Sequence, residues 1–333
     1  MSIHNQNPPE VETASKAVSS LPASRPAFPA GKMWLAALMV LLGGICISFS
    51  AIFVKAAEVS PANSMFYRCF FGGLALLPVA LLNKERFKAP PKTYGALGLV
   101  VICFSLDLIF WHHSIFYIGP GIATILANFH VFFLAGLGFL LFKENLSPGL
   151  LIGLPLALYG LWLVLGVAPE TLDKGTLTGF SQAMFAALWY AFYVLSLRHS
   201  QNMGGRISPV ASMVIISLGC ALFALFICLL DGSSLTIPNN TSLLMLLGYG
   251  VICQAGGGLL FTYGLPRLPA SMGGPLMLVQ PALSFIWDIL IFNRPISLLM
   301  GFGAVLTLAS IYMAVKGQMR AQTKTARQHS QKV

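Results

Sequence analysis

The chain has 333 residues, of which 56% are hydrophobic and only 9% are charged. A soluble domain contains about 25% charged residues, so this composition cannot cover a globule of this size with a polar surface, and the chain is expected to lie in a lipid bilayer. The net charge of +10 does not predict nucleic-acid binding, because the basic residues lie in short segments between apolar runs rather than in a patch with interleaved aromatic residues.

The chain begins with a polar segment, residues 1–31, that is rich in Pro, Ser and Ala. It is predicted to be a disordered cytosolic tail and not a signal peptide. Ten apolar runs follow, each near the ~20 residues that a helix needs to cross a bilayer core, at approximately 33–56, 62–82, 93–115, 119–142, 147–167, 175–197, 209–230, 241–263, 270–292 and 297–316. Residues 317–333 form a basic polar tail of the same kind as the first.

The distribution of Lys and Arg predicts the orientation. If the N-terminus is inside, the inner segments contain 16 of these residues, the outer segments contain 3, and Arg68 lies within a span. Positive residues accumulate on the cytoplasmic side. We therefore expect a multi-pass protein of a bacterial-type inner (plasma) membrane, with both termini in the cytosol.

Two pairs of segments indicate an internal repeat. "SPANSMFYRCFFGGLALLPVALL" (60–82) resembles "SPVASMVIISLGCALFALFICLL" (208–230), and "LFKENLSPGLLIG" (141–153) resembles "IFNRPISLLMGFG" (291–303) at an offset of 150. The repeats are expected to span 32–167 and 168–316, with five helices each. Since five is odd, the halves enter the membrane from opposite sides, which is the inverted-repeat architecture of many secondary transporters.

Several of these segments carry a family resemblance. "FVK" (Phe53–Lys55) ends the first run, "SPANSMFYR" places Arg68 inside the second, and "LFKENLSPGLLIG" contains Glu144 and Gly153. In these features the chain resembles the drug/metabolite transporter superfamily and, within it, the EamA-type ten-helix carriers. The resemblance implies an all-α fold and carrier activity, and such carriers move amino acids, nucleotide-linked metabolites, vitamins and amphipathic drugs. The second copy departs from the pattern, because Arg294 stands where the first copy has its acid.

The third run contains the acid and the two histidines of "LDLIFWHHSIF". Asp107, Trp111 and Ser114 share one helical face, and an acid inside a span usually faces a cavity or a partner. His112 and His113 point away from this face and are expected near the lipid headgroups. Neighbouring helical positions cannot both ligate one ion well, because zinc-binding helices favour i, i+4 spacing, so no metal site is predicted.

Other polar and aromatic groups within spans are candidates for a cavity wall. Thr124 and Asn128 share a face of the fourth run, Trp189 and Tyr193 share a face of the sixth, and Gln254 precedes "AGGG" in the eighth. For Asn128 an interhelical hydrogen bond is equally compatible with the pattern. In the ninth run Gln280 begins a polar stripe with Ser284 and Asp288. The predicted wall consists of Asp107, Trp111, Asn128, Trp189, Tyr193, Gln254 and Gln280.

Two charged residues are assigned structural roles. Arg68 is expected to form an ion pair or hydrogen bond within the bundle, and Glu144 is expected to order the cytosolic end of the fourth helix. Lys55 and Glu58 are expected to be solvated charges at the outer rim.

These expectations lead to a functional hypothesis. No GxxxxGK[ST] loop is present, so the expected function is secondary transport of an amino acid or related amphipathic solute by alternating access, without a cofactor. A single carboxyl in a low-dielectric setting makes Asp107 the candidate for proton coupling. The alternatives are a membrane-embedded enzyme that uses His112 and His113, for which no HExxH or GxSxG motif is found, and a channel. The expected partners are a small-molecule substrate and the lipid bilayer, and the expected state is a monomer or homodimer.

Overall fold

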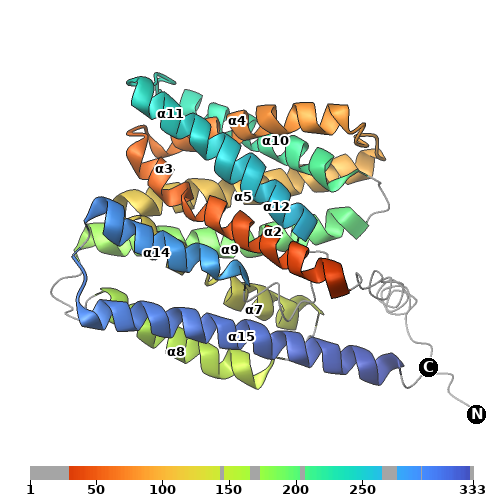
Figure 1. Ribbon diagram of the computed structural model, residues 1–333, viewed down its shortest axis with the longest axis vertical. Helices are drawn as coiled ribbons and strands as arrows, with labels where there is room; N and C mark the ends of the chain where they lie inside the picture. Colours follow the sequence, from red (N-terminus) through yellow and green to blue (C-terminus); the bar gives the residue numbers. More distant parts are fainter. Residues whose placement is uncertain are drawn as a thin grey trace, which may run out of the picture.

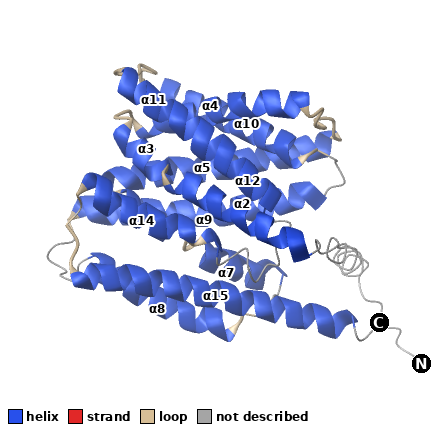
Figure 2. Ribbon diagram, viewed as in Figure 1, coloured by secondary structure: helices blue, strands red, loops and turns tan. Residues whose placement is uncertain are grey.

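The computed structural model describes residues 30–142, 146–165, 173–202, 207–264, 276–293 and 295–330, and within these ranges the regular structure is helical, without strands (Figure 2). Most of the predicted N-terminal tail (1–29) lies outside the described residues. So do Glu144 and Arg294, and the role expected for Glu144 therefore stays a prediction.

The elements follow one another as helices joined by short connections. The first half contains α2 (Ala30–Ser48), α3 (Ser50–Ala56), α4 (Pro61–Leu82), α5 (Pro91–Ile118), α6 (Pro120–Ala127), α7 (His130–Phe142) and α8 (Pro148–Leu165). The second half contains α9 (Lys174–Asn202), α10 (Pro209–Leu230), α11 (Asn240–Gly248), a π-helical segment (Tyr249–Gly257), α12 (Gly258–Gly264), α14 (Val279–Phe292) and α15 (Leu298–Ser330).

The helices lie side by side, with their connections at two opposite edges (Figure 1). Among the described residues, eight spans are long and apolar enough to cross a membrane, and two shorter apolar helices cover 148–164 and 279–292. This confirms the prediction of a polytopic membrane protein of about ten helices. Helix α2 begins and α15 ends at the same edge (Figure 1), and α15 continues to Ser330, through most of the segment predicted as a polar tail.

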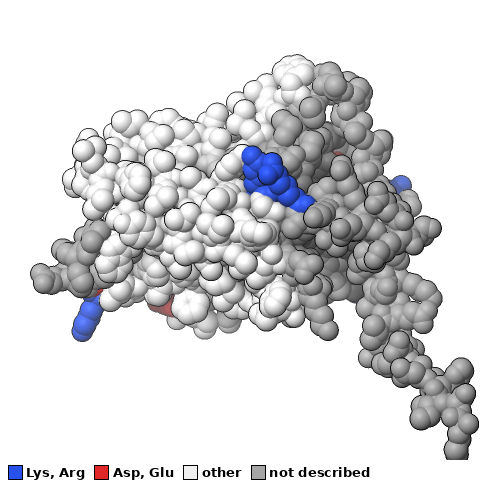
Figure 3. Space-filling view, turned by 90° about the horizontal axis from the view of Figure 1, so that it is seen from below, with Lys and Arg blue, Asp and Glu red and all other residues white. Residues whose placement is uncertain are grey.

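The surface of the bundle is apolar, as lipid contact requires. Leu82, Leu140 and Leu229 are 82%, 72% and 72% exposed. The face in Figure 3 has few Lys or Arg side chains over the part of the chain that the structure describes. In water such a surface would drive aggregation, whereas in a bilayer it lies against acyl chains.

The repeated Ser-Pro dipeptide begins a helix in each half. Pro61 and Pro209 are the first residues of α4 and α10, where a missing backbone N–H has no consequence. The preceding serines cap these helices: Ser60 accepts a hydrogen bond from the amide of Asn63, and Ser208 accepts one from Ala211. The sequence similarity therefore corresponds to one local structure built twice.

The packing of α8 against α15 has the symmetry of two inverted halves. Gly153 lies against Ser310, and Gly160 lies against Gly303. At the repeat offset of 150, residue 153 corresponds to 303 and residue 160 to 310, so each contact is the counterpart of the other. Such exchange of partners is what an approximate two-fold axis produces. The pair lies together at one end of the bundle (Figure 1).

Within the described residues, three of the predicted spans contain a break in the α-helix. The first breaks at Phe49 between α2 and α3, and the fourth breaks at Asn128 and Phe129 between α6 and α7. The ninth turns at Leu278, which corresponds to Asn128 at the offset of 150. Phe49 stacks on Trp287 of α14 at 5.0 Å. The eighth span is wound as a π-helix over its central residues, an arrangement that often marks functional sites.

Candidate functional site

A buried guanidinium lies between helices of both halves. Arg68 of α4 is only 9% exposed, and its Nε donates a hydrogen bond to Oε1 of Gln254 at 2.8 Å. Its Nη1 donates to the hydroxyl of Tyr249, also at 2.8 Å. The guanidinium carbon lies 4.9 Å from the ring centre of Tyr249 and 5.9 Å from that of Trp111. These contacts hold the cation in a fixed orientation.

The imidazole of His112 extends this network. Its Nδ1 lies 2.6 Å from the carbonyl oxygen of Leu108, and its Nε2 lies 3.2 Å from the hydroxyl of Tyr249. A carbonyl only accepts hydrogen bonds, so Nδ1 is the donor; in the neutral imidazole Nε2 is then the acceptor, and Tyr249 donates to His112 while it accepts from Arg68. His112 is fully buried, so the prediction that it lies near the headgroups was wrong, whereas His113 is half-buried.

Gln254 joins the guanidinium to a third helix. Its Nε2 donates to the hydroxyl of Ser217 on α10 at 3.0 Å, while its Oε1 accepts from Arg68. A side chain on Gly72 of α4 would collide with Gln254, so the glycine leaves space for the amide. Both ends of the amide are thereby fixed. We refer to Arg68, Trp111, His112, Ser217, Tyr249 and Gln254 as the arginine cluster.

Asp107 lies beside the arginine cluster without joining it. The carboxyl is buried, with the residue 6% exposed, and it interacts electrostatically with Arg68 and with the hydroxyls of Tyr190 and Tyr193. Between described residues it forms no ion pair or hydrogen bond. The two tyrosines come from α9, with ring centres 5.3 Å apart, and Tyr193 stacks on Phe104 at 4.6 Å.

The structure brings together some of the predicted wall residues and separates others. Trp111 and Gln254 contact Arg68, and Asp107 and Tyr193 interact electrostatically with it. The amide of Asn128 instead donates to the carbonyl of its own helix at Thr124, at 2.8 Å. Trp189 packs on Phe192 with ring centres 5.6 Å apart, and Gln280 is half-buried near Gly44.

Four residues of this region were not among the predicted wall residues: His112, Tyr190, Ser217 and Tyr249. Tyr249 is fully buried, and a hydroxyl within an apolar span needs a partner, so its polarity was an available signal. Its connection to Arg68, 181 positions away, depends on packing that no local pattern reveals.

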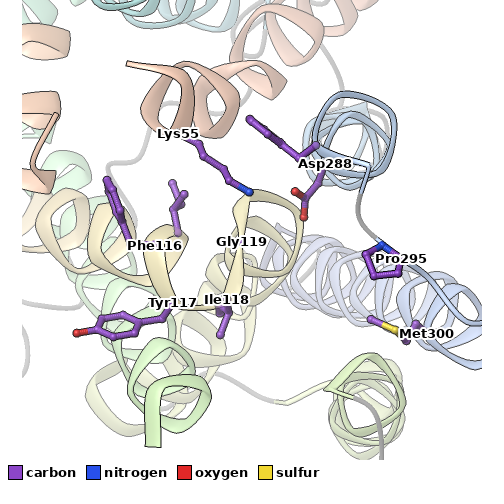
Figure 4. A pocket seen from close by; sticks show the side chains of 10 residues that line it. Lys55, Phe116, Tyr117, Ile118, Gly119, Asp288, Pro295 and Met300 are labelled. Carbon is purple, nitrogen blue, oxygen red and sulfur yellow. The ribbon is translucent and has the colours of Figure 1, made fainter. Parts of the chain in front are cut away.

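A pocket of about 530 Å³ opens at the edge where α5 meets α6. In Figure 4 the side chain of Lys55 extends towards Gly119 and towards the carboxylate of Asp288. That carboxylate accepts a hydrogen bond from the amide of Gly121 at 3.1 Å. Gly119 adopts a φ of +83°, a conformation suited to glycine. The pocket is lined by Lys55, Ile115, Phe116, Tyr117, Ile118, Gly119, Asp288, Phe292, Pro295 and Met300.

The pocket and the arginine cluster share helix α5. Ile115 lines the pocket, and Trp111 lies one turn before it on the same helix. The volume is within the range of small-molecule sites, about 300–1,000 Å³. None of the seven predicted wall residues lines the pocket, whereas Asp288, the last member of the predicted polar stripe, does.

Comparison with known proteins gives matches over most of the chain. The EamA-like transporter family matches twice, over residues 34–166 and 177–316. A protein of Archaeoglobus fulgidus described as an uncharacterized transporter is 25% identical over 275 residues, which cover 83% of this chain and 94% of that protein. A protein of known crystal structure has the same fold, with a TM-score of 0.62 at 16% identity, over 84% of this chain and 96% of that one.

Proposed function

Since this chain belongs to the EamA-like transporter family, we propose that it is a secondary carrier that moves a small organic solute across the membrane by alternating access. The observation that best supports the proposal is the meeting of Arg68, Asp107, His112, Tyr249 and Gln254 in the interior. These residues come from helices of both halves. Movement of one half against the other would therefore change the access to this group from either side.

The chemistry around the arginine cluster favours an amphipathic solute, such as an amino acid or a related metabolite. Asp107 offers a carboxylate, and Tyr190 and Tyr193 offer aromatic surface next to it. Aromatic faces combined with a carboxylate suit a solute with a cationic group and an apolar part. The pocket next to Ile115 serves as the entrance from one side. We place the carrier in the inner membrane with both termini in the cytosol, as the 16-to-3 distribution of basic residues favours.

The hypothesis of an enzyme based on the two histidines receives no support. The family and the Archaeoglobus relative are transporters. Both nitrogens of His112 are engaged, with a backbone carbonyl and with the Tyr249 hydroxyl. Catalysis by an imidazole needs a nitrogen directed at a nucleophile or substrate.

Reconstitution into liposomes tests the carrier function. Vesicles loaded with an unlabelled amino acid mixture should take up labelled members of the mixture by counterflow, and the uptake should saturate with concentration. Uptake that rises linearly without saturation would instead indicate a channel. No uptake of any tested metabolite by folded protein would contradict the proposal.

Proton coupling is proposed for Asp107, because it is a buried carboxyl near the cluster without a hydrogen bond to a described residue. The groups that face it are Arg68, Tyr190 and Tyr193. The Asp107→Asn variant should lose its response to an imposed pH gradient and retain solute exchange at higher solute concentrations. Asp231→Asn, at the exposed end of α10, is the matched control and should respond normally. Undiminished proton-driven uptake by Asp107→Asn would remove Asp107 from this role.

A further inference from the structure

Two opposite charges lie close together in the interior and do not form an ion pair. Arg68 and Asp107 are 9% and 6% exposed and interact electrostatically, yet no contact within ion-pair distance joins them in the structure. An uncompensated charge in a protein interior is strongly destabilising, and within a membrane a carboxylate or guanidinium normally pairs with a neighbour. The separation therefore needs a physical reason.

The hydrogen bonds of Arg68 provide the reason. Gln254 holds Nε and Tyr249 holds Nη1, and these two acceptors are themselves fixed by Ser217 and His112. A guanidinium has five donors in a fixed plane, and these bonds use only two of them. The cation is thus anchored from one side, with donors left over.

Asp107 is arranged in a complementary way. Its carboxylate accepts no hydrogen bond from a described residue, and it lies on α5 one turn before Trp111. Trp111 in turn lies within 5.9 Å of the guanidinium. The carboxylate and the guanidinium thus lie in one neighbourhood, which also contains the hydroxyls of Tyr190 and Tyr193.

We propose that Arg68 and Asp107 form a zwitterion site, in which Arg68 binds the carboxylate of the solute and Asp107 binds its ammonium group. This inference rests on the proposed carrier function and narrows its substrate class to α-amino acids and compounds with the same pair of charges. Binding would give both buried charges a partner at once. An amine would leave Arg68 unpaired and a carboxylic acid would leave Asp107 unpaired, so each should bind on the order of 100-fold more weakly.

Matched ligand triplets test the site. We suggest phenylalanine, phenethylamine and 3-phenylpropionate, together with leucine, 3-methylbutylamine and 4-methylpentanoate. Binding to the full chain in detergent is measured by the rise in thermal stability, which increases with ligand concentration relative to the dissociation constant. At least one amino acid should stabilise the protein at concentrations about 100-fold below those required for its amine and acid analogues.

Two variants separate the roles of the charges. Arg68→Gln should lose the preference for the amino acid over its amine analogue. Asp107→Asn should lose the preference for the amino acid over its carboxylic acid analogue. The amide of the latter still accepts a hydrogen bond, so solute exchange persists at higher concentration. Because each variant retains the preference governed by the other charge, that preference serves as a control for folding.

Several results would overturn the site. Equal binding of all three members of a triplet would do so, as would an unchanged preference in Arg68→Gln. If no amino acid binds while liposomes transport another class of metabolite, the zwitterion site is wrong and the carrier function stands. If no metabolite is transported at all, the carrier function itself fails.

Discussion

Replacing one glycine at the crossing of α8 and α15 should destabilise the protein. A Cβ on Gly303 would lie 2.5 Å from the carbonyl oxygen of Gly160, 2.7 Å from Cβ of Leu163 and 2.9 Å from the amide nitrogen of Val164. These atoms belong to a helix backbone or are attached directly to it, so no rotamer change can move them away. Ordinary contacts begin at 3.4 Å, so the helices must separate by roughly 1 Å, which weakens the dispersion contacts along the crossing.

The magnitude follows from two opposing terms. Overpacking of this kind typically costs about 1–3 kcal/mol, and alanine is better than glycine in a helix by about 0.5–1 kcal/mol. Because the three overlapped atoms are backbone atoms or attached directly to the backbone, the cost should be in the upper part of this range, about 2–3 kcal/mol, so Gly303→Ala should lose about 1–2.5 kcal/mol and melt about 2–10 °C lower. The melting is followed in detergent with a thiol-reactive fluorescent dye, because Cys69 and Cys220 are fully buried and become reactive on unfolding.

Gly301 provides the matched control on the same helix. A Cβ at this position would meet no atom within 4 Å, so Gly301→Ala should melt at the wild-type temperature or slightly above it. If both alanine variants melt alike, or if Gly303→Ala is as stable as the wild type, the packing argument is refuted.

Two further predictions concern hydrogen bonds. Tyr249→Phe removes the hydroxyl between Arg68 and His112, so it should destabilise the protein by about 1–3 kcal/mol in the same melting assay; an unchanged melting temperature would mean that the hydroxyl is dispensable. Asp173 accepts hydrogen bonds from Thr176, which lower the pKa of its carboxyl. The ionised carboxyl of Asp173 should therefore stabilise the folded state fully at neutral pH, and this stabilisation should disappear as the pH falls below the ordinary aspartate pKa of about 3.9. At pH 7, Asp173→Ala should melt at a lower temperature than the wild type, and at strongly acidic pH the two proteins should melt at the same temperature. A difference that persists in acid would contradict this.

The fold was largely predictable because bilayer crossing imposes a long apolar run on every span. The helix starts were encoded as well: Pro61 and Pro209 begin α4 and α10 in the structure. The breaks at Phe49, Asn128 and Leu278 were not predicted, since each lies within an apolar run without proline at that position. Their geometry depends on tertiary contacts, such as the stacking of Phe49 on Trp287.

The same breaks explain why the site was predicted only in part. Asp107 and Trp111 lie on the uninterrupted helix α5, so their shared face follows from ideal spacing. Asn128 lies at a break and Gln280 lies just after one, and there the ideal angles no longer apply. His112 was misplaced because α5 continues to Ile118, three residues beyond the predicted end, which places the imidazole deeper in the bundle.

The two halves differ in charge at several pairs of corresponding positions, and one of these pairs includes Asp288. Asp288 faces the pocket and holds the amide of Gly121, and its counterpart at the offset of 150 is Gly138 in α7. In the proposed alternating-access cycle, the cavity that would form on the opposite side of the membrane has the hydrogen atom of Gly138 where the present pocket has the Asp288 carboxylate. We therefore expect a charged solute to be bound differently on the two sides of the membrane, because the two nearly symmetric halves would form chemically different openings.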